Sequence, residues 1–95
     1  MSQQMRLGKL ATKVVYTKNG MDVFFYNTKI VNLAGRKLTL DTGGWFIATT
    51  RTRMNQVSNQ FGLGYGVIQR NYEWYIVYGD EIIPFIGNKI TIKLN

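Results

Sequence analysis

The chain has 95 residues with no cysteine and no histidine, and it carries 12 Lys and Arg against 5 Asp and Glu. This length supports one domain with a single modest core. The lack of cysteine excludes a disulfide framework and a thiolate metal site, and the lack of histidine removes the commonest general base and metal ligand. Most enzyme classes are therefore disfavoured, and we expect no catalytic residue, no metal site and no cofactor.

The net charge of +7 is unevenly spread along the chain. Residues 1–70 hold ten Lys and Arg against Asp22 and Asp41, whereas residues 71–95 are nearly balanced. One-sided positive charge is expected of a surface that meets a polyanion such as nucleic acid, although it also serves solubility. The N-terminus lacks the apolar run of a signal peptide, and no stretch approaches the roughly 18 apolar residues of a membrane span. We expect a soluble, cytoplasmic protein.

The first elements in chain order are a loose arm over residues 1–9 and then a single β-rich domain over residues 10–95. From Thr12 onward, short apolar and aromatic runs alternate with turn residues, a pattern typical of hairpins. An Asn19-Gly20 turn is predicted in the first hairpin, because both central residues of a type I′ turn need positive φ. The second hairpin turns through residues 34–36. The strands expected here are TKVVYT, MDVFFYN, KIVNL and KLTLD.

The segment GGWFIATTRTRMNQVSNQFGLGY, residues 43–65, predicts one short amphipathic helix over residues 50–61. Thr49 and Thr50 are candidate N-caps, and Gly62 is the candidate left-handed C-cap. At 100° per residue the apolar side chains share one stripe. The opposite side holds amides, hydroxyls and guanidiniums without any acid. The apolar stripe consists of Met54, Val57 and Phe61.

Further short strands follow the helix: YGVIQR, EWYIVYG, EIIPFI and KITIKL. Pro84 cannot donate a ladder hydrogen bond, so its strand is expected at a sheet edge or at a bulge. The order of strands, helix and strands predicts a mainly β fold. We expect a small curled antiparallel sheet or an SH3-like barrel, with the helix covering one open end.

The block from Gly43-Gly44-Trp45 through Thr49-Thr50 and Arg53-Met54-Asn55-Gln56 to Ser58-Asn59-Gln60-Phe61 resembles a group of small uncharacterised proteins of tailed bacteriophages. Trp74-Tyr75 extends the resemblance downstream. It implies a viral accessory protein that works inside a bacterium, and it carries over no activity. It also favours two tasks that such proteins commonly have: handling nucleic acid, or binding and blocking a host factor.

The polar helix face is the first candidate binding site, formed by Arg51, Arg53, Asn55 and Asn59. Asn pairs bidentately with adenine and Arg with guanine, and Arg neutralises phosphates. The alternative is structural, because amides in a small fold commonly bond to neighbouring loops. Arg70, Tyr72 and Trp74 complete the candidate site, since aromatic rings beside a cation can stack single-stranded bases.

Leu40-Asp41-Thr42-Gly43 matches the active-site tripeptide of retroviral-type aspartic proteases, in which two chains each supply one Asp. Asp-Thr-Gly is also ordinary chemistry where a strand ends in a turn. We predict that Asp41 ends a strand and does no chemistry.

The sequence therefore favours a small, basic phage-type protein that is not an enzyme and that binds DNA or RNA. An inhibitor that docks on a host protein is the main alternative. A virion or assembly component and a dimeric aspartic protease using Asp41 are further alternatives. The oligomeric state stays open, with a homodimer possible.

Overall fold

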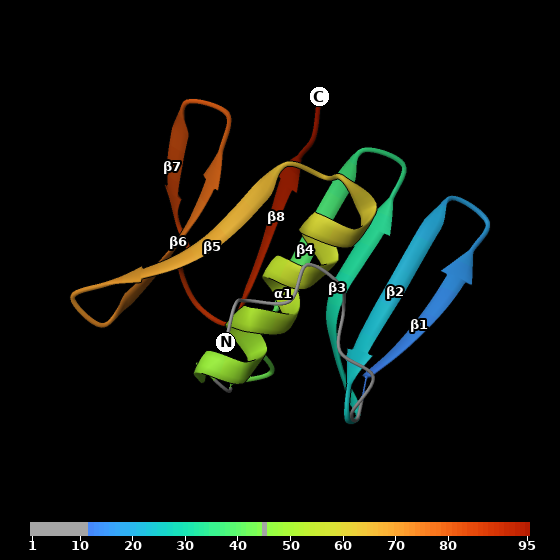
Figure 1. The fold of residues 1–95 in the computed structure, drawn as a ribbon, viewed down its shortest axis with the longest axis horizontal. Coiled ribbons are helices and arrows are strands. Elements are labelled where there is room, and N and C mark those ends of the chain that lie inside the picture. The colour runs from blue at the N-terminus through green and yellow to red at the C-terminus, as the bar shows by residue number, and fades with distance from the viewer. Residues whose placement is uncertain (1–11, 45) are drawn as a thin grey trace.

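The computed structural model describes residues 12–44 and 46–95, so the predicted arm over residues 1–9 lies outside the described residues. This part of the chain forms eight strands and one helix, and Figure 1 shows their arrangement. The mainly β fold with one helix is confirmed. In chain order the elements are β1 (Thr12–Thr17), β2 (Gly20–Phe25), β3 (Thr28–Ala34), β4 (Lys37–Asp41), α1 (Ala48–Phe61), β5 (Tyr65–Arg70), β6 (Glu73–Tyr78), β7 (Glu81–Pro84) and β8 (Lys89–Lys93).

The strands form two antiparallel sheets, not a closed SH3-like barrel. The larger sheet has the order β1-β2-β3-β4-β8, and the smaller sheet has the order β5-β6-β7. The chain crosses after β7 and pairs β8 with β4, as Figure 1 shows in red and green, and the larger sheet stays open because its edge strands β1 and β8 do not pair with each other. Pro84 ends the edge strand β7, as predicted for a residue without a backbone N–H.

One core is shared by both sheets and the helix. Along β2 and β4 the buried residues alternate with more exposed ones, as expected for a sheet with one face on the core; they are Met21, Val23, Leu38 and Leu40. The helix α1 packs against β3 and β5, which places it between the two sheets. The fully or nearly fully buried apolar side chains include Leu38 and Leu40 of the larger sheet, Met54 and Val57 of the helix, and Val67, Trp74 and Ile76 of the smaller sheet.

The helix begins two residues earlier than predicted. Ile47 is the N-cap residue, with extended backbone angles and no side-chain cap bond, so Thr49 and Thr50 are not caps. Thr50 lies inside the first turn and is buried, which leaves its side chain no room to cap from outside the helix. The predicted C-cap is confirmed, because Gly62 is left-handed (φ 65°, ψ 38°) and the Leu63 N–H donates to the Ser58 carbonyl at 3.0 Å.

The first hairpin forms as predicted, but its turn lies one residue earlier. Thr17 pairs with Gly20, so Lys18 and Asn19 form the turn. Gly20 belongs to the strand and does not have positive φ. It is glycine for another reason: a Cβ built there would lie 1.9 Å from the Leu33 carbonyl oxygen. A close approach of two strands therefore explains the Asn-Gly pair, not a type I′ turn.

Candidate functional site

Asn55 joins the helix to the smaller sheet. Its Nδ2 donates to the Val67 carbonyl at 2.9 Å, and its Oδ1 accepts from the Val67 N–H at 2.7 Å. Next to it, the Tyr65 hydroxyl donates to the Met54 carbonyl at 2.8 Å, and burial raises the pKa of Tyr65. The Asn55 amide therefore bonds to the backbone of a neighbouring element, as expected if this helix face has a structural role. The proposed contact of Asn55 with a ligand stays a prediction.

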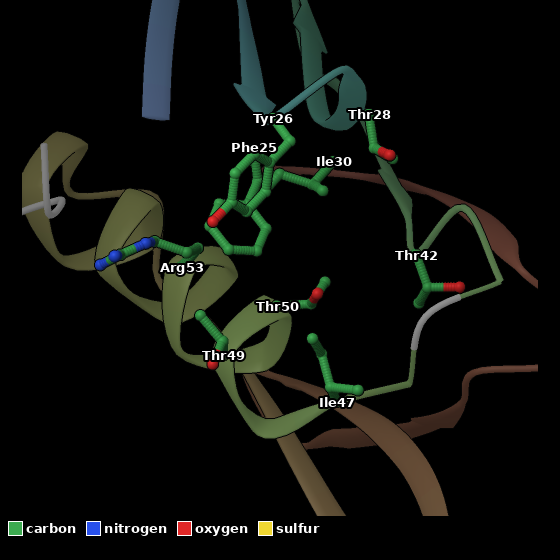
Figure 2. Close-up of a pocket in the computed structure, with 9 residues that line it drawn as sticks. All are labelled: Phe25, Tyr26, Thr28, Ile30, Thr42, Ile47, Thr49, Thr50 and Arg53. Carbon is green, nitrogen blue, oxygen red and sulfur yellow. The ribbon is translucent and has the colours of Figure 1, made fainter. Parts of the chain in front are cut away.

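Arg53 lies on the other side of the helix. Its Nη1 donates to Gln56 Oε1 at 3.0 Å, and its Cζ is 5.6 Å from the centroid of the Phe25 ring. Its Nε is buried without a hydrogen-bond partner among the described residues. Arg53 also lines an apolar cavity of about 580 Å³ beside the first turns of α1, which Figure 2 shows with Phe25, Tyr26, Ile47 and Thr50 around it.

Arg51 and Trp74 come together where the helix crosses the smaller sheet. The Arg51 guanidinium carbon is 5.8 Å from the centroid of the Trp74 ring, and Arg51 Nη1 donates to Gln69 Oε1. Trp74 is only 4% exposed, and its indole Nε1 has no hydrogen-bond partner among the described residues. Trp74 therefore belongs mainly to the core, and Arg51 covers it from the helix side.

Arg70, Asn71, Tyr72 and Glu73 form the hairpin tip between β5 and β6. Arg70 pairs with Glu73, which leaves Asn71 and Tyr72 as a two-residue turn. Tyr72 is 95% exposed, so it presents its whole ring to solvent. The structure thus brings together Arg51, Tyr72 and Trp74 at one place, with Arg70 adjoining. Asn59 is exposed but lies eight residues along the helix from Arg51, about 12 Å along its axis.

An aromatic groove of about 640 Å³ lies beside the hairpin tip. Phe46 packs edge-on against Trp74 with ring centroids 5.1 Å apart, and Phe85 does so at 6.0 Å. Phe46 and Phe85 were not predicted as site residues, because they meet Trp74 only through the packing of separate segments. The groove is lined by Phe46, Tyr72, Glu73, Trp74, Tyr75, Pro84, Phe85, Ile86, Gly87 and Asn88.

On the outer surface of the hairpin, Glu73 accepts a hydrogen bond from Tyr75. The Tyr75 hydroxyl donates to Glu73 Oε2 at 3.2 Å. This hydrogen bond and the negative charge of Glu73 raise the pKa of Tyr75, while the nearby Arg70 acts in the opposite direction. Tyr75 is therefore neutral at physiological pH, and Arg70 is the cation of this surface.

A second surface, not predicted from the sequence, is the outer face of the larger sheet. Side chains alternate along each strand, so the residues next to the core positions Val14, Leu38 and Ile92 point outward. Five of the outward residues on these strands are lysines, and two more basic residues stand in the turns that end this face. We name this set the lysine face: Lys13, Lys18, Lys29, Arg36, Lys37, Lys89 and Lys93. The sequence contained a signal for this face, because each of four strands has a lysine next to an apolar position.

Both acids of this face already have hydrogen-bond and ion-pair partners. Asp22 accepts from the Asn32 amide and lies 3.5 Å from Lys29 Nζ. Asp41 accepts from the Gly43 N–H at 2.8 Å and lies 4.0 Å from Lys89 Nζ. Within the described part of the chain, the other five basic residues of the lysine face form no ion pair. The three remaining acids, Glu73, Asp80 and Glu81, all belong to the smaller sheet and its turns.

Asp41 is the last residue of β4, as predicted. Its contacts with Gly43 and Lys89 hold the turn that leaves the strand, where Thr42 Oγ1 also accepts from the Gly44 N–H at 3.1 Å. These contacts are the ones expected where a strand ends in a turn at Asp-Thr-Gly. The prediction that Asp41 performs no reaction stays a prediction.

The described residues contain neither a cluster of metal ligands nor a membrane-spanning helix. No group of three or more His, Cys, Asp or Glu side chains is placed to hold a metal ion there. No helix formed by residues 12–44 or 46–95 has the length and apolar character needed to cross a membrane.

The fold and these surfaces define a small two-sheet β protein with one helix, a lysine-rich sheet face and an exposed aromatic hairpin tip. The chain belongs to the Kyanoviridae Gp96 protein family, whose model matches residues 1–92. The predicted tailed-phage origin is thereby confirmed, whereas the role of the Gly43 to Phe61 block within the family is not tested. No curated protein and no solved structure gives a significant match to the chain.

Proposed function

We propose that this phage protein binds nucleic acid, with the lysine face as its main contact surface. The observation that supports the proposal is the separation of charge between the two sheets. Seven basic residues stand on or beside the outer face of the larger sheet, where both acids are paired. The helix and the smaller sheet together carry three Arg and three acids. Such a one-sided field favours a polyanionic ligand.

The layout of the lysine face suits a phosphate backbone. Lys13, Lys29 and Lys89 stand at one end of the face, and Lys37 and Lys93 stand four residues further along their strands, about 13 Å away. Between the two ends the register places Asn32, Thr39 and Thr91, and Asp22 beside Asn32 lies 3.5 Å from Lys29 Nζ. Cations at both ends, with hydrogen-bonding groups and one paired acid between them, can contact phosphates and sugars without reading bases.

The test is the salt dependence of binding to fluorescein-labelled oligonucleotides. The logarithm of the association constant should fall linearly with the logarithm of salt concentration, with a slope of about −0.7 to −0.9 for each phosphate contacted. The double variant Lys37→Gln/Lys93→Gln removes two cations from one end of the face. It should reduce the steepness of the slope by about 1.4 to 1.8.

The matched control is Asp80→Asn/Glu81→Gln, which changes the net charge by the same amount in the opposite direction on the smaller sheet. The control should leave the slope unchanged if the contact is local. Binding that ignores salt between about 50 and 300 mM, or a slope equally affected by both double variants, would contradict the lysine face as the contact surface.

Docking on a host protein is the second candidate, and exposed apolar side chains support it. Phe46, Ile47 and Ile86 are 43%, 46% and 78% exposed around the start of the helix and the aromatic groove. Exposed apolar patches of this kind often mark protein interfaces. A pull-down from bacterial lysate with and without nuclease separates the two candidates. A single protein that remains bound after nuclease treatment favours docking, and loss of all partners favours nucleic acid.

A further inference from the structure

The backbone of the hairpin tip is unusual at Tyr72. Asn71 and Tyr72 have φ of 50° and 69°, so both central residues of this two-residue turn are left-handed. That geometry is the type I′ turn, for which Asn-Gly is the preferred pair. Asn71 fits the first position. Tyr72 occupies the second, where a residue with a Cβ strains the backbone.

Among the described residues, no packing contact compensates for this strain. Tyr72 is 95% exposed, so its ring gains almost no packing energy. A strained backbone that holds an exposed aromatic ring is a feature typical of functional sites. The strain therefore points to a use of the ring outside the folded chain.

The surroundings of Tyr72 indicate what that use is. Tyr72 borders two hollows, the aromatic groove on one side and a polar hollow with Arg51, Gln69 and Asn71 on the other. Arg51 donates to Gln69 with one of its five N–H groups, so it keeps donors for a phosphate. An aromatic platform beside guanidinium groups is the combination that binds unpaired bases and their backbone.

We propose that the hairpin tip stacks an unpaired base of a single-stranded nucleic acid on Tyr72, with Arg51 and Arg70 on the neighbouring phosphates. The inference rests on the proposed nucleic-acid binding and names its substrate class. A base inside a duplex is already stacked on both faces, so a ring at a hairpin tip reaches it only after it leaves the stack. Lys89 directly follows Gly87 and Asn88 of the aromatic groove, so the groove adjoins the lysine face at the start of β8.

The experiment compares wild type and Tyr72→Gly in the full chain. The probes are a fluorescein-labelled oligothymidylate of about 15 nucleotides, a length near the upper end of single-strand site sizes, and a mixed-sequence duplex of equal length. Wild type should bind the single strand more tightly than the duplex. Tyr72→Gly should raise the melting temperature by about 4–8 °C, because it creates the preferred Asn-Gly turn. It should weaken single-strand binding by about 5- to 150-fold, the loss expected for one base–aromatic stack, and leave duplex binding unchanged.

Tyr26→Gly is the matched control. Tyr26 also has positive φ (55°) and is 69% exposed, but its ring packs on Phe25 with centroids 4.8 Å apart, and it lies in the turn between β2 and β3, which borders a different cavity. This variant should leave single-strand binding at the wild-type value. Tyr72→Phe keeps the ring and should retain binding. Tyr72→Asn, whose residue tolerates left-handed backbone, should lose single-strand binding as Tyr72→Gly does.

The outcomes separate this inference from the proposed function. If wild type binds neither probe, both are wrong. If wild type binds and Tyr72→Gly binds the single strand equally well, the stacking site is wrong and the lysine face stands; that result is also the one expected if the tip anchors a protein. Equal losses for single strand and duplex would overturn the single-strand assignment.

Discussion

At the scale of single residues, one amide decides how the helix is held. Asn55 satisfies both backbone groups of Val67, and the partly buried position of these bonds makes them costly to lose. Asn59 stands one turn later on the same helix and is exposed. The two asparagines therefore look alike in the sequence pattern and differ in their surroundings.

We expect Asn55→Ala to lower the free energy of unfolding by about 1–3 kcal/mol, because it leaves the Val67 N–H and carbonyl unpaired. Asn59→Ala is the control of the same chemistry. It should be neutral or stabilising by a few tenths of a kcal/mol, roughly the helix-propensity gain of Ala over Asn. Urea unfolding of both variants measures the difference. Equal stabilities would show that the Asn55 bonds contribute nothing.

At the scale of elements, helix α1 has a capped C-terminus, but its N-terminus lacks a side-chain cap. Gly62 closes its C-terminus, whereas Ile47 provides no side-chain acceptor for the first N–H groups and no acid stands in the first turn. Ile47 has the extended backbone that a capping residue needs, and it is 46% exposed. The start of α1 therefore gives up a stabilising contact that its backbone geometry already permits.

Ile47→Ser should raise the free energy of unfolding relative to Ile47→Ala by about 0.5–2 kcal/mol, since both variants remove the same apolar side chain and only Ser adds a cap bond. Thermal unfolding of the two variants measures the gain. A Ser variant no more stable than the Ala variant would mean that the side chain at position 47 does not reach the first-turn N–H groups.

At the scale of the whole molecule, the two sheets depend on one core. Leu40 of the larger sheet and Ile76 of the smaller sheet are both fully buried in it, with Met54 and Val57 of the helix between the sheets. Neither sheet has a second apolar layer of its own among the described elements. The sheets are therefore expected to unfold together as one cooperative unit.

Leu40→Ala and Ile76→Ala should each lower the free energy of unfolding by about 2–5 kcal/mol. Each variant should weaken amide hydrogen-exchange protection in β3 and in β6 to the same extent, although each side chain belongs to only one of the two sheets. Protection lost in one sheet and kept in the other would show that the sheets are separate folding units.

Local signals in the sequence determined much of this architecture. The 3.6-residue apolar period and Gly62 predicted the helix, and the two-residue period with turn residues predicted the hairpins, because these features depend on neighbours in the chain. Pro84 predicted an edge strand, since a missing N–H acts wherever the strand lies. The uneven charge along the chain likewise signalled a basic surface.

Tertiary structure alone decided which strands and side chains meet. The pairing of β8 with β4 joins segments about 50 residues apart, and it brings Lys93 beside Lys37. The packing of α1 on β5 sets Asn55 against Val67 and Arg51 over Trp74. The left-handed backbone of Tyr72 follows from the register of β5 with β6, which no property of tyrosine predicts. Residue patterns specify each element, but contacts between distant elements depend on how the shared core is packed, and the sites lie at those contacts.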